Sequence, residues 1–164
     1  MKTLYIVGGT MGVGKTTVCQ RLKSMLDRCA FLDGDWCWDM HPFQVTDETK
    51  ALVTDNICHH LNSFLHCTAF ENVVFCWVMH QQEIIDDILS RLDTSGWRVV
   101  NISLVCTPEA LKKRLQRDVN VGIRTEDVIE RSLARIPMYK ALNTIKLDAS
   151  IKSVDELAME IMEL

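Results

Sequence analysis

The stretch of sequence that decides the fold is Gly9-Thr10-Met11-Gly12-Val13-Gly14-Lys15-Thr16, which matches the pattern G-x-x-x-x-G-K-[ST] at every fixed position. It follows a short apolar run at residues 3–7 and precedes apolar residues at helical spacing, so it joins a predicted strand to a predicted helix. Glycines let such a loop wrap tightly, with backbone N–H groups pointing at phosphate oxygens, and the helix N-terminus adds a positive dipole end. This stretch, called the phosphate loop below, predicts nucleotide binding.

Two side chains at the end of the phosphate loop supply a charge and a hydroxyl for a bound nucleotide. Lys15 is expected to reach the β- and γ-phosphates, and the Thr16 hydroxyl is expected to ligate Mg²⁺. The predicted nucleotide-binding residues of this segment are Gly9, Thr10, Met11, Gly12, Val13, Gly14, Lys15, Thr16 and Thr17.

Short apolar runs alternate with amphipathic stretches along the whole chain. Strands are expected at residues 3–7, 30–33, 73–79, 98–106 and 144–147. Helical patterns lie between and after them, at about 18–26, 46–69, 84–92 and 108–117, then from 125 and from 153. Thr46 and Ser153 are the expected caps of two of these helices. This alternation predicts an α/β fold with a parallel sheet covered on both faces, in which ligands gather at the carboxyl ends of the strands.

Composition excludes several classes of partner. The chain has 164 residues, which fits one domain over residues 1–164. The formal net charge is −4 and no run of Lys or Arg occurs, so neither nucleic acid nor an anionic membrane is an expected partner. The seven cysteines include no C-x-x-C pair and mostly sit in apolar runs, and no stretch is apolar enough to span a membrane, so a cytoplasmic location is expected.

Three further stretches carry a family resemblance. They are Leu32-Asp33-Gly34-Asp35, then Leu111 to Arg117, and Arg135-Ile136-Pro137-Met138-Tyr139. With the phosphate loop, they make nearly the whole chain similar to the P-loop small-molecule and nucleotide kinases, a family that includes shikimate, gluconate and adenylylsulfate kinases and chloramphenicol phosphotransferase. The resemblance implies a P-loop NTPase fold of three α/β/α layers, five parallel strands in the order 2-3-1-4-5, a short lid at about residues 117–125, and Mg-ATP as phosphoryl donor.

Asp33 and Asp35 form the D-x-D of this resemblance. Two residues apart on a strand, they are expected to point to the same side. Asp33 would then hold a water of Mg²⁺, and Asp35 would orient or deprotonate the acceptor hydroxyl. The alternative is an ordinary Asp-Gly turn at the end of a strand. The third strand is followed by His80 and two glutamines with no carboxylate, which moves the metal role to Asp33.

Four arginines have roles by resemblance. Arg114 would stack on adenine, while Arg117 or Arg124 would approach the transferring phosphoryl group from the lid, because a guanidinium offers both a flat face and forked donors. Arg135 would bind an anionic group of the acceptor or the phosphates. For each of them the alternative is a solvated position on a charged helix face.

The acceptor is expected near the D-x-D segment. Trp36 and Trp38 either pack in the core or line a pocket, and His41 follows them. His80 either contacts the acceptor or simply ends a strand. The histidines and cysteines between residues 58 and 67 are too widely spaced on a helix for a zinc site.

The predicted activity is an ATP-dependent transfer of the γ-phosphate to a hydroxyl of a small molecule, with Lys15, Asp35, Arg117 and Arg124 as catalytic residues. Two alternatives stay open. One is a nucleoside or nucleotide kinase with a base-sized pocket near residues 36–41. The other is a non-catalytic ATP-binding regulatory domain.

Overall fold

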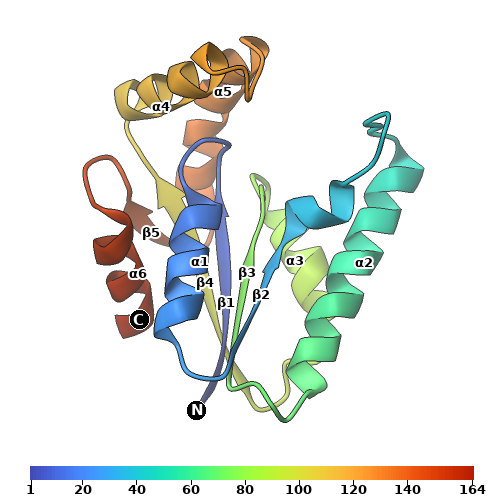
Figure 1. Ribbon diagram of the computed structural model, residues 1–164. Coiled ribbons are helices and arrows are strands. Elements are labelled where there is room, and N and C mark those ends of the chain that lie inside the picture. The colour runs from blue at the N-terminus through green and yellow to red at the C-terminus, as the bar shows by residue number, and fades with distance from the viewer.

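The computed structural model describes residues 1–164 and contains one five-stranded parallel sheet. Its strand order is β2-β3-β1-β4-β5, which confirms the predicted α/β fold and the order taken from the resemblance. The strands are β1 (Lys2–Gly9), β2 (Cys29–Asp33), β3 (Asn72–Cys76), β4 (Trp97–Val105) and β5 (Ile145–Asp148). All carboxyl ends lie at one edge of the sheet, where β1 runs into the phosphate loop (Figure 1).

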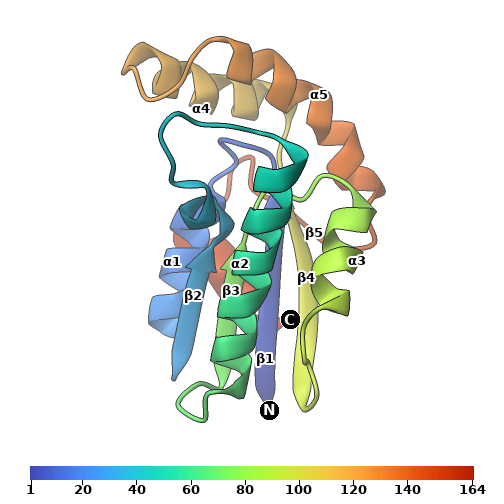
Figure 2. The same cartoon turned by 90° about the vertical axis from the view of Figure 1, so that its right-hand side faces the viewer.

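Helices form the two outer layers and a cap (Figures 1 and 2). On one face lie α1 (Lys15–Met25) and α6 (Val154–Glu163), and on the other lie α2 (Asp47–His66) and α3 (Gln82–Ser90). The pair α4 (Pro108–Asn120) and α5 (Asp127–Ala141) extends across the carboxyl edge of the sheet. The phosphate loop therefore lies beneath a helical cap.

The alternation of β1 side chains explains the layering. Tyr5 and Val7 pack into the cluster that contains α1 and α6, whereas Leu4 and Ile6 pack into the cluster with α2 and α3. All four are at most 5% exposed, as expected of a central strand covered on both faces. Both layers thus hold β1 rigidly, and with it the start of the phosphate loop.

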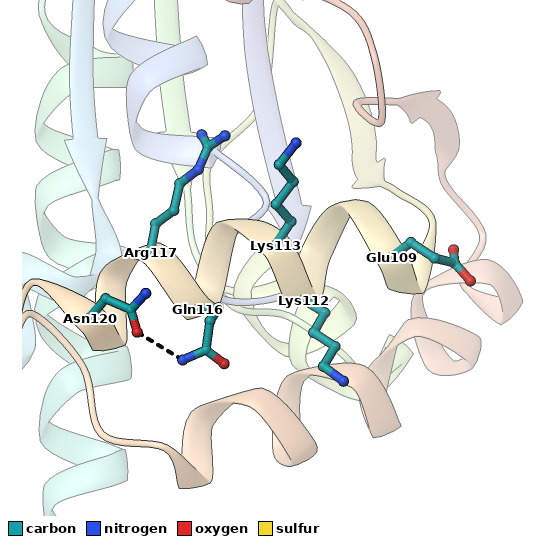
Figure 3. Close-up of a pocket in the computed structure, with 6 residues that line it drawn as sticks. All are labelled: Glu109, Lys112, Lys113, Gln116, Arg117 and Asn120. Atoms are coloured by element: carbon teal, nitrogen blue, oxygen red, sulfur yellow. Dashed lines mark hydrogen bonds between the residues drawn. The ribbon is translucent and has the colours of Figure 1, made fainter.

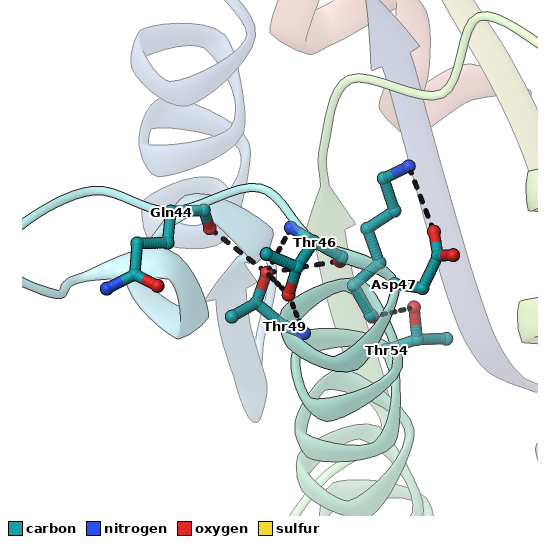
Figure 4. Close-up of polar contacts among 6 residues, drawn as sticks. Gln44, Thr46, Asp47, Thr49 and Thr54 are labelled. Atoms are coloured by element: carbon teal, nitrogen blue, oxygen red, sulfur yellow. Dashed lines mark hydrogen bonds and ion pairs between the residues drawn. The ribbon is translucent and has the colours of Figure 1, made fainter.

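Helix α2 begins with a reciprocal cap (Figure 4). The Thr49 N–H donates to Thr46 Oγ1 at 3.1 Å, and the Thr46 N–H donates to Thr49 Oγ1 at 2.8 Å. The Thr49 hydroxyl also donates to the Gln44 carbonyl at 3.0 Å, which ties the preceding loop to the helix. Thr46 was predicted as this cap, and the structure confirms it.

Three of the differences from the predicted elements lie near the phosphate loop. The strand expected at 73–79 ends at Cys76, because residues 77–81 leave the ladder to form the loop before α3. A 3₁₀ helix, η1 (Gly34–Trp38), follows β2 and was not predicted. Helix α4 continues to Asn120 instead of ending near 117. All three differences lie at the carboxyl edge of the sheet, around the phosphate loop.

None of the helices combines the length and the hydropathy that crossing a membrane requires.

Candidate functional site

Lys15 opens α1 at the end of the phosphate loop and is 9% exposed. Its Nζ donates to the Thr10 carbonyl at 3.1 Å, so the ammonium group closes the loop on itself. Burial lowers the pKa of Lys15, because an ammonium ion loses hydration there. The Thr10 hydroxyl in turn donates to the Ser132 carbonyl of α5 at 3.3 Å, which links the loop to the helical cap.

The end of β2 meets the phosphate loop through one short hydrogen bond. Thr16 Oγ1 donates to Asp33 Oδ2 at 2.6 Å, and Asp33 is only 4% exposed. The other carboxylate oxygen, Oδ1, accepts from the Asp35 N–H at 3.0 Å. A hydroxyl and a carboxylate held this close are hard oxygen ligands of the kind that Mg²⁺ takes, so the two residues fit a magnesium site.

The strand argument for the D-x-D pair is wrong, although both aspartates do face the phosphate loop. β2 ends at Asp33, which caps η1, and Asp35 lies in the first turn of that 3₁₀ helix. Asp35 is brought to the loop by this turn and not by strand alternation. Gly34 is required between them, because a Cβ there would lie 2.5 Å from Cγ of Trp77.

The environment of Asp35 raises the pKa of its carboxyl group. Desolvation by the surrounding residues is the largest cause, although Asp35 as a whole is exposed, and the charge of Asp33 adds to it, while Lys15, Arg124 and Trp77 act in the opposite direction. Trp77 lies on the segment that leaves β3, with its side chain beside the Asp35 carboxylate. The backbone N–H of Trp77 donates to the Val7 carbonyl at 3.2 Å. Sequence reasoning missed Trp77, because its apolar surroundings were interpreted as a buried strand.

These groups surround one cavity of about 280 Å³ at the phosphate loop. Its lining combines loop residues with the D-x-D segment, the β3–α3 loop and the helical cap: Met11, Gly12, Gly14, Lys15, Thr16, Thr17, Asp35, Val78, Asp118 and Arg124. Val78 and Asp118 were not predicted from the sequence. The cavity therefore joins the expected phosphate site to Asp35.

Of the two lid arginines, the structure brings Arg124 to the cavity. Its Nε donates to Asp118 Oδ2 at 3.0 Å, and its side chain is 29% exposed. Arg117 instead lines a shallow hollow along α4. Figure 3 shows Arg117 and Lys113 on one side of that helix, and Lys112 and Gln116 on the other.

Arg114 connects the phosphate loop to the segment after β5. Its guanidinium donates to the Val13 carbonyl at 3.1 Å and also reaches the main-chain carbonyls of Ala149 and Ser150. Two chain segments far apart in sequence are thereby fixed on either side of this arginine. The stacking role expected from the resemblance is compatible with this position and stays a prediction.

Arg135, His80 and Tyr139 lie near one another, and each carries polar atoms without a partner. Burial and the charge of Arg135 lower the pKa of His80, and His80 Nδ1 is buried without a hydrogen bond. Tyr139 Oη is buried without a close hydrogen bond, and burial raises the pKa of this phenol, while the nearby backbone groups of Met79 and Gly9 act to lower it. Arg135 is half-buried on α5 and makes no ion pair. The group can receive a polar or anionic ligand.

The other expected acceptor residues are more dispersed. Trp36 is 54% exposed, and its ring packs edge-on against that of Phe31 with 5.3 Å between the ring centroids. Trp38 packs partly against the core, and His41 is exposed. In the helix α2 segment, His66 pairs with Asp93 at 3.0 Å. No group of three or more His, Cys, Asp or Glu side chains suited to a metal ion occurs in the structure.

Residues 6–134 match the family model described as an AAA domain. The chain belongs to this AAA domain family. The matched range contains the phosphate loop, the D-x-D segment, both lid arginines and most of the helical cap. No match was found among curated protein sequences.

Solved structures place this AAA domain among known folds. A gluconokinase from Sinorhizobium meliloti has a TM-score of 0.70 at 16% identity, covering 98% of this chain and 90% of that one. A sugar kinase from Janibacter sp. has 0.71 at 15%, covering 99% and 94%. A shikimate kinase from Bacteroides thetaiotaomicron has 0.63 at 18%, covering 99% of both chains. The predicted resemblance to P-loop small-molecule kinases is confirmed at the level of the fold.

Proposed function

We propose that this protein is an ATP-dependent kinase that transfers the γ-phosphate to a hydroxyl of a small molecule. The observation that carries the proposal is that one cavity brings Lys15 and Thr16 of the phosphate loop together with Asp35 and Arg124. A nucleotide switch needs the first two residues and one carboxylate for the metal, which Asp33 can supply, but it has no need of a second carboxylate facing them. A phosphotransferase needs such a carboxylate to aim its acceptor.

In this proposal the nucleotide binds at the phosphate loop. Backbone N–H groups of residues 9–17 and the start of α1 hold the phosphates, and Lys15 exchanges its bond to the Thr10 carbonyl for one to a phosphate oxygen. Arg114 donates through its N–H groups to main-chain carbonyls, so the flat face of its guanidinium serves as a platform for adenine.

Thr16 and Asp33 would hold Mg²⁺, Thr16 through its hydroxyl and Asp33 through a water, since the two lie together beside the phosphate loop. The bound ion supplies neutralisation of phosphate charge and a fixed template for the phosphate oxygens. The protein's own contribution is to keep the Asp33 carboxylate oriented, through the hydrogen bonds that it accepts from the Thr16 hydroxyl and from the Asp35 N–H.

Asp35 orients the acceptor hydroxyl and accepts its proton as the acceptor oxygen bonds to the γ-phosphorus and the bond to ADP breaks. Arg124 donates to the moving phosphoryl group, which carries the charge of the transition state. Residues 117–125 act as a lid over the single domain, and its closure excludes the water that would otherwise compete with the acceptor.

Arg135 and His80 bind the remote part of the acceptor, and Trp36 and His41 border it. An unpaired half-buried guanidinium beside a neutral imidazole favours an acceptor with an anionic or strongly polar group. This assignment leaves Asp35 for the reacting hydroxyl.

Arg135→Ala is then expected to raise the KM of the acceptor about 10-fold, the cost of one charge-assisted hydrogen bond, with kcat changed less.

The proposal is tested by ADP release with Mg-ATP across a panel of sugars, polyols, sugar acids, nucleosides, nucleotides and aminoglycoside-like alcohols. One acceptor should raise ADP release well above the water background and gain one phosphoryl group by mass spectrometry.

Lys15→Met should lower that rate of ADP release about 10²–10³-fold or more, and Lys140→Met, at an exposed site on α5, should not. A response to nucleosides or nucleotides alone would assign the alternative acceptor class. A flat panel with tight ATP binding would replace the kinase by a nucleotide-sensing domain.

Thr16→Val is expected to raise the Mg²⁺ concentration for half-maximal turnover about 10-fold or more, because it deletes a metal ligand and leaves Asp33 without its 2.6 Å partner. The measurement is a magnesium titration of ADP release at saturating ATP. The matched control is Thr54→Val on α2, where the hydroxyl bonds only to its own helix. An unchanged magnesium requirement would remove Thr16 from the metal site.

A further inference from the structure

Asp118 is a carboxylate in the cavity that is proposed to receive phosphates, where a negative charge is unfavourable by itself. It lies in the last turn of α4, and its side chain is 32% exposed. Its single charged partner is Arg124, through the 3.0 Å bond to Nε. The proposed transfer gives Asp118 no direct task, so its presence there calls for a different role.

The same residue also fixes the backbone that carries Arg124. The Asp118 carbonyl accepts from the Ile123 N–H at 2.9 Å and from the Arg124 N–H at 3.3 Å. Within the turn between α4 and α5, Asp118 thus holds Arg124 both at its backbone and at its side chain. A lid arginine without these bonds would be a flexible side chain on an exposed loop, and ordering it would cost conformational entropy.

The bond uses only the Nε–H of the guanidinium. Both terminal nitrogens of Arg124 make no hydrogen bond in the structure, so four N–H donors remain available on a side chain that borders the cavity. Arg124 and Asp35 line the same cavity, and the positive charge of Arg124 acts to lower the pKa of Asp35. The Asp118 carboxylate thus binds Nε of Arg124 and leaves the two terminal nitrogens of the guanidinium available to a ligand.

We propose that Asp118 is a positioning residue that holds Arg124 with its two terminal nitrogens directed at the γ-phosphate site. The inference rests on the proposed function for its catalytic meaning. It also goes further, because it assigns a γ-phosphate contact that can be measured by binding alone. Arg124 distinguishes ATP from ADP, and Asp118 is the reason it is in place to do so.

The test compares the affinities for Mg-ATP and Mg-ADP by calorimetry in wild type, Asp118→Ala, Arg124→Ala and the double variant. We expect the ratio of ATP to ADP affinity to fall about 3- to 10-fold in each single variant, as for one charge-assisted hydrogen bond. The double variant should fall no further than Arg124→Ala, because Asp118 acts only through Arg124. Asp55→Ala is the matched control: it breaks an exposed pair with Arg91 at 2.7 Å, away from the lid, and should leave the ratio unchanged.

Two results would overturn the inference. If Asp118 were only a local negative charge, its removal would strengthen ATP binding at least as much as ADP binding, and the ratio would hold or rise. If it only stabilised the fold, Asp118→Ala would lower both affinities and the Tm together while the ratio held. The outcome is independent of the acceptor: a wild type that discriminates ATP from ADP but phosphorylates nothing in the panel would refute the kinase and leave the role of Asp118 standing.

Discussion

Replacing Asp35 with asparagine is expected to lower kcat about 10²–10⁴-fold, because the amide can neither accept the acceptor proton nor aim the hydroxyl as a carboxylate does. ATP affinity should stay within about twofold of wild type, since Asp35 is assigned to the acceptor and not to the nucleotide. The measurements are steady-state kinetics with the acceptor identified in the panel and a nucleotide titration. Asp39→Asn, four residues along and exposed, is the control.

The pH dependence of wild type gives an independent check on Asp35. Desolvation and the charge of Asp33 raise the pKa of this carboxyl above 3.8, so the acid limb of kcat/KM should lie above the usual aspartate range. A raised folded-state pKa means that the protonated form stabilises the fold at low pH and that this stabilisation is lost as pH rises through the folded pKa. At neutral pH, Asp35→Asn should therefore raise the Tm. Lost turnover with a lower Tm would point to misfolding, and unchanged turnover would remove Asp35 from catalysis.

Gly12→Ala is expected to lower the free energy of unfolding by about 2–5 kcal/mol and to weaken ATP binding strongly. The backbone of Gly12 has a φ of +80°, where an L-residue costs about 1–2 kcal/mol. A Cβ there would also lie 2.5 Å from Cδ2 of Leu115, and overpacking adds about 1–3 kcal/mol. Relief of that contact must move the fully buried Leu115 side chain, the phosphate loop or α4. Urea unfolding and a nucleotide titration measure the two effects.

Gly96 separates the two contributions, since it has a φ of +78° with no atom within 4 Å of an added Cβ. It lies between α3 and β4, away from the cavity, so Gly96→Ala should cost only the conformational strain of about 1–2 kcal/mol and leave ATP binding intact. Equal losses of stability in the two variants would show that α4 does not press on the phosphate loop.

The sequence was sufficient for the phosphate loop and for the layered α/β architecture. Continuous apolar runs identified central strands, and the glycine pattern before Lys15 identified the turn into α1, because both are local signals with a fixed spacing. The caps at Thr46 and Ser153 were likewise predicted and are present. The strand order came from the family resemblance, since no local pattern encodes which strands are neighbours.

The D-x-D segment shows where local reasoning reached a correct placement by an incorrect route. Asp33 and Asp35 do lie against the phosphate loop, but a 3₁₀ turn places the second of them. The Asp33-Gly34 pair is itself a turn signal, kept above as the alternative interpretation, and Asp33 caps the turn by accepting from the Asp35 N–H. The packing of Trp77 on Gly34 joins segments more than forty residues apart, and no pattern within residues 32–36 contains that contact.

Sequence by itself thus determined that a nucleotide-binding loop, two carboxylates and several arginines meet at one edge of a parallel sheet. The tertiary structure decided which of them share the cavity: Arg124 and not Arg117, together with Asp118 and Val78. The reason is that α4 continues to Asn120 with Leu111 and Leu115 buried, and its helical phase then places Arg117 among the exposed residues that line the shallow hollow along α4. The turn closed by Asp118 brings the next arginine back to the loop, and its direction depends on the packing of distant segments.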